Sequence, residues 1–186
     1  MIAIGATQMA EKFYTVGHGT RPIDGFLDLL NEATVRLVVD VRTAPRSRTN
    51  PQFDRDALAN SLAAFTIEYR HIAGLGGLRP RQKAISASTN AFWQNQSFHN
   101  YADYAMSPEF QSALEELREL GRAKRCAIMC AETLWWRCHR RIITDYLLAA
   151  GETVFHIIGT GQIEQAHKTP AAKRRPDGVL IYPANT

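Results

Sequence analysis

The sequence lacks the features of a membrane or exported protein. It contains no run of about 18 apolar residues, so no transmembrane helix and no membrane partner are expected. Residues 1–11 have no basic start followed by a long apolar segment, which is not typical of a signal peptide. We therefore expect residues 1–12 to form a flexible N-terminal tail and the protein to be cytoplasmic.

Cysteine is scarce and unevenly distributed. The chain has three cysteines in 186 residues, and all of them lie between positions 126 and 138. An odd, clustered set does not suit a disulfide framework and favours a reducing compartment. Repeats and low-complexity segments are also lacking. Residues 13–186 are therefore interpreted as a single α/β domain, with a polar loop or insertion at 79–97.

The charge is mildly basic. The formal net charge is +4 and the isoelectric point is near 9.1. This balance favours anionic partners, although it is too small to indicate nucleic acid by itself. A small anionic ligand is the expected partner, nucleic acid is a weakly supported alternative, and no cofactor is expected.

Strand-like and helix-like segments alternate along the chain. Short apolar runs predict strands at 13–17, 35–41, 67–72, 127–130 and 154–158, with a late strand at 179–182. The segments between them carry apolar residues at helical spacing. This alternation predicts a three-layer, Rossmann-like fold, in which a mostly parallel sheet of about five strands has helices on both faces.

Local signals predict where the helices begin and end. Thr20 is expected to cap the first helix, and Ser107 to cap a later one that starts with Pro108. Phe65 continues the apolar stripe of the second helix. Gly121 is expected to end the helix that Ser107 begins.

Reactive side chains recur at the ends of the predicted strands. Because ligands bind outside the carboxyl ends of parallel strands, these residues are expected to share one site. They are His18, Asp40, Arg42, His71, Cys130, Glu132, His156 and Gly159.

Cys130 and Glu132 are the first candidates for catalysis. Cys130 is predicted to lie just before a helix, where free N–H groups and nearby arginines would favour a nucleophilic thiolate. Its alternative role is that of a buried strand cysteine. Glu132 is a candidate general acid or base, or else a helix cap. Cys126 is expected in the strand core, and Cys138 is expected to pack the helix start.

Arginines follow two of the predicted strands. Their planar forks bind phosphate and carboxylate, so an anion pocket is favoured over solvated surface arginines and one pair with Asp40. His71 and His139 complete the expected set of anion-binding residues. The arginines are Arg42, Arg46, Arg48, Arg137 and Arg140.

His18 lies between two glycines, which predicts a close approach of the backbone to another group. It is a candidate catalytic residue, with a structural hydrogen-bonded role as the alternative. His18 or His139 could also bind zinc with Cys130 and Cys138, but the cysteine spacing does not match paired zinc motifs. No metal site is therefore predicted. A disulfide between these two cysteines is a further possibility.

Several motifs together resemble a known family. Residues 13–158 are similar to the bacterial and archaeal family called domain of unknown function number 488. The resemblance implies an α/β fold and a shared set of residues, with no established reaction. Residues 133–137 depart from it, because they are bulky and apolar where a polar turn is usual. The matching segments are 15–20, 39–42, 45–48, 69–71, 75–77, 101–110, 129–132, 138–140 and 154–157.

Three functions are compatible with these residues. The favoured hypothesis is an enzyme acting on a small phosphorylated or nucleotide-like substrate in a strand-end cleft, with Cys130 or Glu132 doing the chemistry. One alternative is a non-catalytic module that binds a nucleotide or nucleic acid. The other is a thiol redox or metal sensor that uses Cys130 and Cys138.

Overall fold

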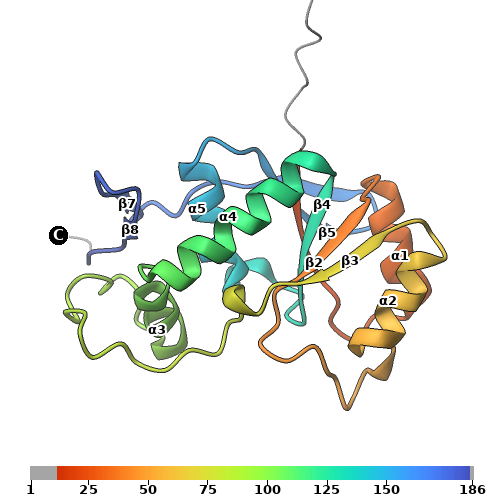
Figure 1. Ribbon diagram of the computed structural model, residues 1–186, viewed down its shortest axis with the longest axis horizontal. Coiled ribbons are helices and arrows are strands. Elements are labelled where there is room, and N and C mark those ends of the chain that lie inside the picture. Colours follow the sequence, from red (N-terminus) through yellow and green to blue (C-terminus); the bar gives the residue numbers. More distant parts are fainter. Residues whose placement is uncertain (1–11, 185–186) are drawn as a thin grey trace, which may run out of the picture.

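The computed structural model in Figure 1 describes residues 12–184. Its main sheet has six strands in the order β3-β2-β4-β1-β5-β6. The first five strands are parallel, and β6 pairs antiparallel with β5. The predicted tail, except for Lys12, lies outside the described residues. The strands are β1 (Phe13–Gly17), β2 (Leu37–Asp40), β3 (Glu68–His71), β4 (Cys126–Cys130), β5 (Val154–Gly159) and β6 (Gln162–Gln165).

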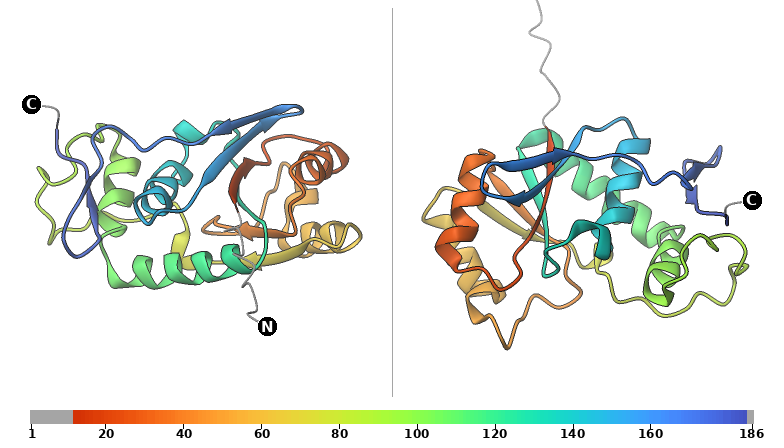
Figure 2. Two further views of the ribbon diagram at one scale, coloured as in Figure 1. Left: turned by 90° about the horizontal axis from the view of Figure 1, so that it is seen from above. Right: turned by 180° about the vertical axis from the view of Figure 1, so that it is seen from behind.

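The helices lie on both faces of the sheet, as the alternating pattern predicted (Figures 1 and 2). Three short 3₁₀ helices, η1 (Pro51–Phe53), η2 (Ala73–Leu75) and η3 (Trp135–Arg137), connect them to strands. The three-layer, Rossmann-like α/β arrangement is therefore confirmed. The α-helices are α1 (Ile23–Glu32), α2 (Arg55–Ala63), α3 (Gln96–Tyr104), α4 (Pro108–Ala123) and α5 (Arg140–Ala149).

Successive strand residues point to opposite faces, so each face has its own core. Val38 and Met129 pack with α1 and α2, and Val39 and Ile128 pack with α3, α4 and α5. These side chains are fully buried. Each contributes about 1.5–3 kcal/mol to the free energy of unfolding. The central strands are therefore apolar on both sides, and their polar residues are displaced to the strand ends.

Some predicted helix boundaries were wrong. Pro22 precedes α1 and no side chain caps it, so Thr20 is not its cap. Phe65 lies beyond the end of α2 and is 44% exposed. Gly121 does not end α4, because its missing Cβ makes room for the ring of Phe13 inside a helix that continues to Ala123. The cap at Ser107 is confirmed, since its hydroxyl accepts from the N–H of Phe110.

Three strands were not fully predicted. β6 is exposed along its whole length and has no apolar alternation, so its sequence pattern is weak. The late strand exists as β8 (Leu180–Ile181), but it pairs with β7 (Lys173–Arg174) in a separate two-stranded sheet. Among the described residues, none of the helices is both long and apolar enough to cross a membrane.

The strand order reverses direction within the sheet. From β1 the chain runs to β2 and β3 on one side, then returns through β4 and continues to β5 on the other side. The crevice at such a reversal is the usual ligand site of open α/β sheets. The carboxyl end of β4 lies between β1 and β2, so Cys130 stands at this reversal.

Candidate functional site

A pocket of about 410 Å³ lies at the carboxyl ends of β2 and β4. Strand β4 contributes its last residue, Cys130, to the wall. The segment that follows β2, the glycine-rich turn after η2, the start of α3 and the segment before α5 contribute the rest. The lining residues are Arg42, Thr43, Ala44, Arg46, Gly77, Leu78, Ser97, Phe98, Tyr101, Cys130, Ala131, Glu132, Arg137, Cys138 and His139.

The chain after Cys130 is held by a close approach to β1. The N–H groups of His18 and Gly19 donate to the carbonyls of Cys130 and Ala131, at 3.0 and 2.9 Å. A Cβ on Gly17 would lie 2.1 Å from the carbonyl oxygen of Glu132. The two glycines therefore admit a turn of the chain itself, which is the close approach that the glycine pattern predicted.

The prediction that Cys130 directly precedes a helix was wrong. A turn and η3 follow it, and α5 begins only at Arg140. It is Cys138 that lies at the start of α5, with its carbonyl accepting from the N–H of Arg141 at 2.9 Å. Because the segment between them folds back, both sulfur atoms reach the pocket. Cys138 is therefore as well placed for chemistry as Cys130.

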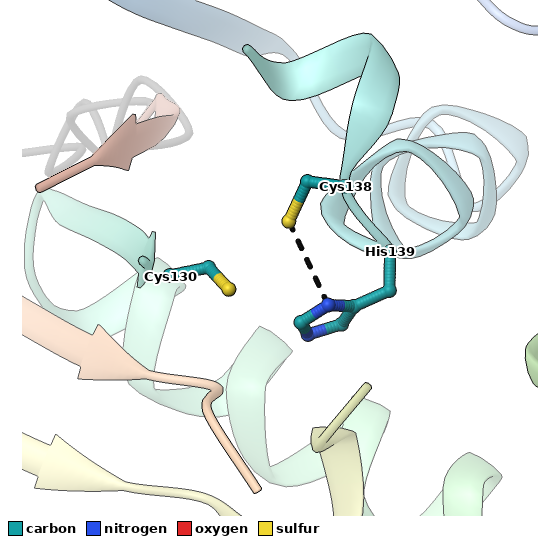
Figure 3. Close-up of side chains that lie close together, drawn as sticks. All are labelled: Cys130, Cys138 and His139. Carbon is teal, nitrogen blue, oxygen red and sulfur yellow. Dashed lines mark hydrogen bonds between the residues drawn. The ribbon is translucent and has the colours of Figure 1, made fainter. Parts of the chain in front are cut away.

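Cys130, Cys138 and His139 form a compact cluster of donor atoms. Figure 3 shows Cys130 pointing from the end of β4 toward Cys138 and His139. The two sulfur atoms and a ring nitrogen all lie within 4.8 Å of one another, so this group could hold a metal ion. Cys138 Sγ is 3.6 Å from His139 Nδ1. Cys126, at the other end of β4, is in the core as predicted.

The ring of His139 is oriented by two contacts. Its Nε2–H donates to the carbonyl of Val41 at 2.9 Å. Its ring also meets that of Tyr101 edge to face, with 5.0 Å between the centroids. Because Nε2 is engaged by this bond, Nδ1 is the ring nitrogen that faces Cys138.

The two thiols of the cluster differ in acidity. Burial opposes ionisation of Cys138, but a hydrogen bond from Cys130 and the charge of Arg140 outweigh it and hold the pKa of Cys138 well below its ordinary value. The hydrogen bond to Cys138, together with burial, raises the pKa of Cys130. By comparison, burial raises the pKa of Cys126 to about 12. The cluster thus pairs a more acidic thiol, Cys138, with a less acidic one, Cys130.

Arg140 is buried next to the cluster and contacts Cys138. It is only 1% exposed and does not line the pocket. Its Nε–H donates to Cys138 Sγ at 3.3 Å, and a terminal N–H donates to the carbonyl of Glu132. Arg140 therefore holds the Glu132 turn and the Cys138 sulfur in one arrangement.

Asp40 organises a second group of side chains at the same edge. Arg42 is 5% exposed and donates to both carboxylate oxygens of Asp40, at 2.6–3.1 Å, and to the carbonyl of Phe53. The hydroxyl of Tyr69 donates to Asp40 at 2.7 Å. Although Arg42 lines part of the pocket, most of its N–H groups already have partners in this Asp40 network.

His18 belongs to this network and does not line the pocket. Its Nδ1–H donates to the carbonyl of Gly19 at 2.9 Å, and its Nε2 is 3.3 Å from a guanidinium nitrogen of Arg42. Its ring stacks on Phe53. Burial lowers the pKa of His18, which keeps the ring neutral.

The remaining predicted residues separate into two groups. Arg46, Arg137 and Glu132 are exposed and line the pocket. Arg48 is exposed and is not among the lining residues. His71 donates to the carbonyl of Arg42 at 2.8 Å and faces a different hollow, next to Arg46.

Several lining residues were not predicted from sequence. Phe98 and Tyr101 belong to α3 and bring apolar surface to the pocket. Gly77 packs against His139, because a Cβ at this position would lie 2.4 Å from Nδ1. The glycine-rich segment 74–77 was the signal that could have indicated such a contact. The aromatic residues of α3 carried no comparable signal.

His156 lies buried on β5, where it packs against Trp135. Its ring stacks on Trp135 at 4.1 Å and bonds to the hydroxyl of Thr15 at 2.7 Å. Its Nε2 has no hydrogen-bond partner among the described residues. Burial, with a smaller contribution from Arg140, lowers the pKa of His156 to about 4. This histidine is therefore a neutral core residue.

Comparison with known proteins gives one match. Neither a curated protein nor a solved structure matches the chain. The family model described as "Domain of unknown function DUF488" matches residues 22–147, more than half of the chain. The matched region includes Asp40, Arg42 and Tyr69 of the Asp40 network and the whole Cys130–Cys138–His139 cluster. The chain therefore belongs to the DUF488 family.

Proposed function

We propose that this protein is an enzyme that acts on a small anionic substrate, phosphorylated or nucleotide-like, bound in the strand-end pocket. The main support is the position of the Cys130–Cys138–His139 cluster. It lies in the wall of a pocket that two exposed arginines also line. Ionisable groups with shifted pKa values beside a cleft are typical of functional sites.

The chemistry of the lining supports a substrate with two parts. Arg46 and Arg137 have guanidinium groups that can bind an anion such as phosphate in a bidentate way. Leu78, Phe98 and Tyr101 offer apolar and aromatic surface in the same pocket. An anionic group joined to a flat apolar body, as in an aryl phosphate or a nucleotide, satisfies both parts.

Glu132 is assigned the role of proton transfer. It lines the pocket beside Cys130, and its carboxylate is oriented by accepting the N–H of Leu134 at 3.0 Å. The other carboxylate oxygen is available to a substrate or a water molecule. A positioned general acid or base typically contributes about 10²–10⁴-fold to the rate.

The test is turnover of probes that match the two-part substrate. The purified protein is incubated with p-nitrophenyl phosphate and with nucleoside monophosphates, and release of nitrophenol and phosphate is followed. We expect turnover that falls by about a hundredfold or more in Glu132→Gln. Glu116→Gln, a change of the same kind on the remote helix α4, should leave it unchanged.

Two results would contradict the proposal. Binding of these probes without any turnover would indicate a non-catalytic nucleotide-binding module. If the protein neither binds nor turns over these probes, the proposal of an anion-binding pocket is wrong.

A further inference from the structure

The cluster contains one thiol more than a thiol nucleophile with a histidine base requires. We propose that Cys130, Cys138 and His139 together bind a zinc ion, and that this ion takes part in the reaction of the pocket. The catalytic part of this inference rests on the proposed function. Zinc binding itself does not, because it can be measured without substrate.

The spacing of the donor atoms fits tetrahedral zinc. Zinc–sulfur bonds of about 2.3 Å and zinc–nitrogen bonds of about 2.0–2.1 Å place the two ligand atoms roughly 3.6 Å apart at a tetrahedral angle. The observed separation of Cys138 Sγ and His139 Nδ1 is 3.6 Å. Cys130 Sγ lies within 4.8 Å of both atoms and points toward them (Figure 3). An ion placed between these atoms can contact them all after small side-chain movements.

The groups around the donors match those that support a bound metal. A histidine ligand usually donates its second ring N–H to a carbonyl or carboxylate, which fixes the ring and its tautomer. His139 does this through Val41, leaving Nδ1 toward the cluster. Arg140 donates to Cys138 Sγ, which stabilises a thiolate ligand.

The site leaves one tetrahedral position open. In the described part of the chain the cluster supplies three donors. A structural zinc site has four protein ligands, whereas a catalytic site has three and leaves the fourth position for water or substrate. All three donor residues line the pocket, as does Glu132. The open position would therefore take a water molecule or a substrate oxygen in the pocket that Glu132 also lines.

The spacing of the cysteines in the sequence did not predict zinc, because separation along the chain does not give the distance between side chains in the fold. Cys130 and Cys138 are separated by a turn and η3, so they do not form the short paired motif of structural zinc sites. The sequence offers His18 or His139 as the third donor, and the fold brings His139 to the two cysteines. His18 is instead bonded to Gly19 and Arg42.

Metal content tests the proposal directly. The full chain is purified in reductant without chelator, and zinc is measured by mass spectrometry and by titration of the metal-free protein. We expect one zinc ion per chain. Cobalt, added in place of zinc, should give the visible bands of tetrahedral coordination and sulfur-to-cobalt charge transfer.

Substitutions identify the ligands. Cys138→Ser and His139→Gln should each weaken zinc binding by more than about a hundredfold, since even residues around the ligands are worth 10–100-fold. Cys126→Ala is the matched control, because it removes a thiol from the same strand and the same side of the sheet but at the far end. It should retain full zinc. Circular dichroism confirms that each variant is folded.

The outcomes of these experiments separate zinc binding from the alternatives. Reduced protein that takes up neither zinc nor cobalt overturns the proposal, and a reversible Cys130–Cys138 disulfide in that protein would assign the pair to redox chemistry. Zinc lost from Cys126→Ala but not from Cys138→Ser also overturns it. Turnover that survives complete metal removal refutes the catalytic role and leaves the proposed function intact. Bound zinc without turnover supports the site and contradicts the enzyme.

Discussion

The carboxyl edge of the sheet carries two polar groups that differ in how completely their members are paired. In the Asp40 network, Arg42 and Tyr69 donate to a fully buried carboxylate, and His18 completes the set. In the Cys130–Cys138–His139 cluster, the sulfur atoms face one another and a pocket. A histidine belongs to each group, and an arginine donates to each, Arg42 to Asp40 and Arg140 to Cys138.

The difference separates structural from reactive side chains. A buried charge whose hydrogen bonds are all made within the protein is stabilised where it is and has little left to offer a ligand. Donor atoms that remain available next to a cavity can bind an ion or a substrate. The two groups therefore differ in how many of their hydrogen-bonding atoms already have partners within the protein.

The largest effect is expected in the Asp40 network. Asp40→Asn keeps the volume but leaves the buried guanidinium of Arg42 without its counter-charge, so the free energy of unfolding should fall by about 3–5 kcal/mol. Urea denaturation measures it. Glu116→Gln, which breaks the exposed pair with Arg70, should cost less than about 1 kcal/mol. Equal losses in the two variants would show that burial of the network does not matter.

The buried histidines should make stability depend on pH. In the folded protein burial holds the pKa of His156 near 4, below the value of about 6.5 in the unfolded chain. The unfolded state therefore binds more protons between these values, and stability should fall as pH decreases from about 6.5 to 4. His156→Gln should remove on the order of 2–3 kcal/mol of this dependence. Unfolding curves at several pH values measure it, and an unchanged slope would contradict the assignment.

Gly77 should be sensitive because it contacts the cluster. A Cβ at this position would lie 2.4 Å from Nδ1 of His139, whose ring is held by Val41 and Tyr101. Gly77→Ala should cost about 1–3 kcal/mol in stability and displace the imidazole, which can be followed by its NMR signals. Gly25→Ala, in an open position of α1, should instead stabilise by up to about 1 kcal/mol. An unmoved His139 signal in the first variant would refute the contact.

The smallest effect is expected at the rim of the pocket. Arg46→Ala removes a charged donor that lines it, and inorganic phosphate should bind about tenfold more weakly, as measured by calorimetry. Arg48→Ala changes an arginine two residues away that is not among the lining residues, so its effect should be within twofold. Equal weakening in both variants would indicate a general effect of charge instead of a pocket.

The sequence predicted the layers of this fold better than its details. Alternating apolar runs are local signals, and they located all five parallel strands. Boundaries failed where a distant partner decided them. Gly121 continues its helix because Phe13 occupies the space beside it. β6 is an edge strand whose place depends on pairing with β5 rather than on its own composition.

Sequence predicted the sheet edge at which the pocket lies and part of the pocket lining. Cys130, Glu132, Arg46, Arg137 and His139 all line the pocket. Cys138 was expected only to pack the helix start or to serve the redox or metal alternative. Its place in the pocket wall was not predicted, because the fold of the segment after Glu132 cannot be deduced from spacing. Arg42 looked like a ligand-binding residue, yet its partner Asp40 lies two positions away and occupies most of its donors.

Sequence alone determined which elements form and which edge of the sheet collects the polar residues, because both follow from local periodicity and from the position of each residue at a strand end. Tertiary structure alone decided which of those residues find partners. That outcome depends on register, as in the alignment of Gly17 with Cys130 and of Asp40 with Met129. Register and packing join residues far apart in the chain, and these contacts separated the saturated Asp40 network from the open cysteine–histidine cluster.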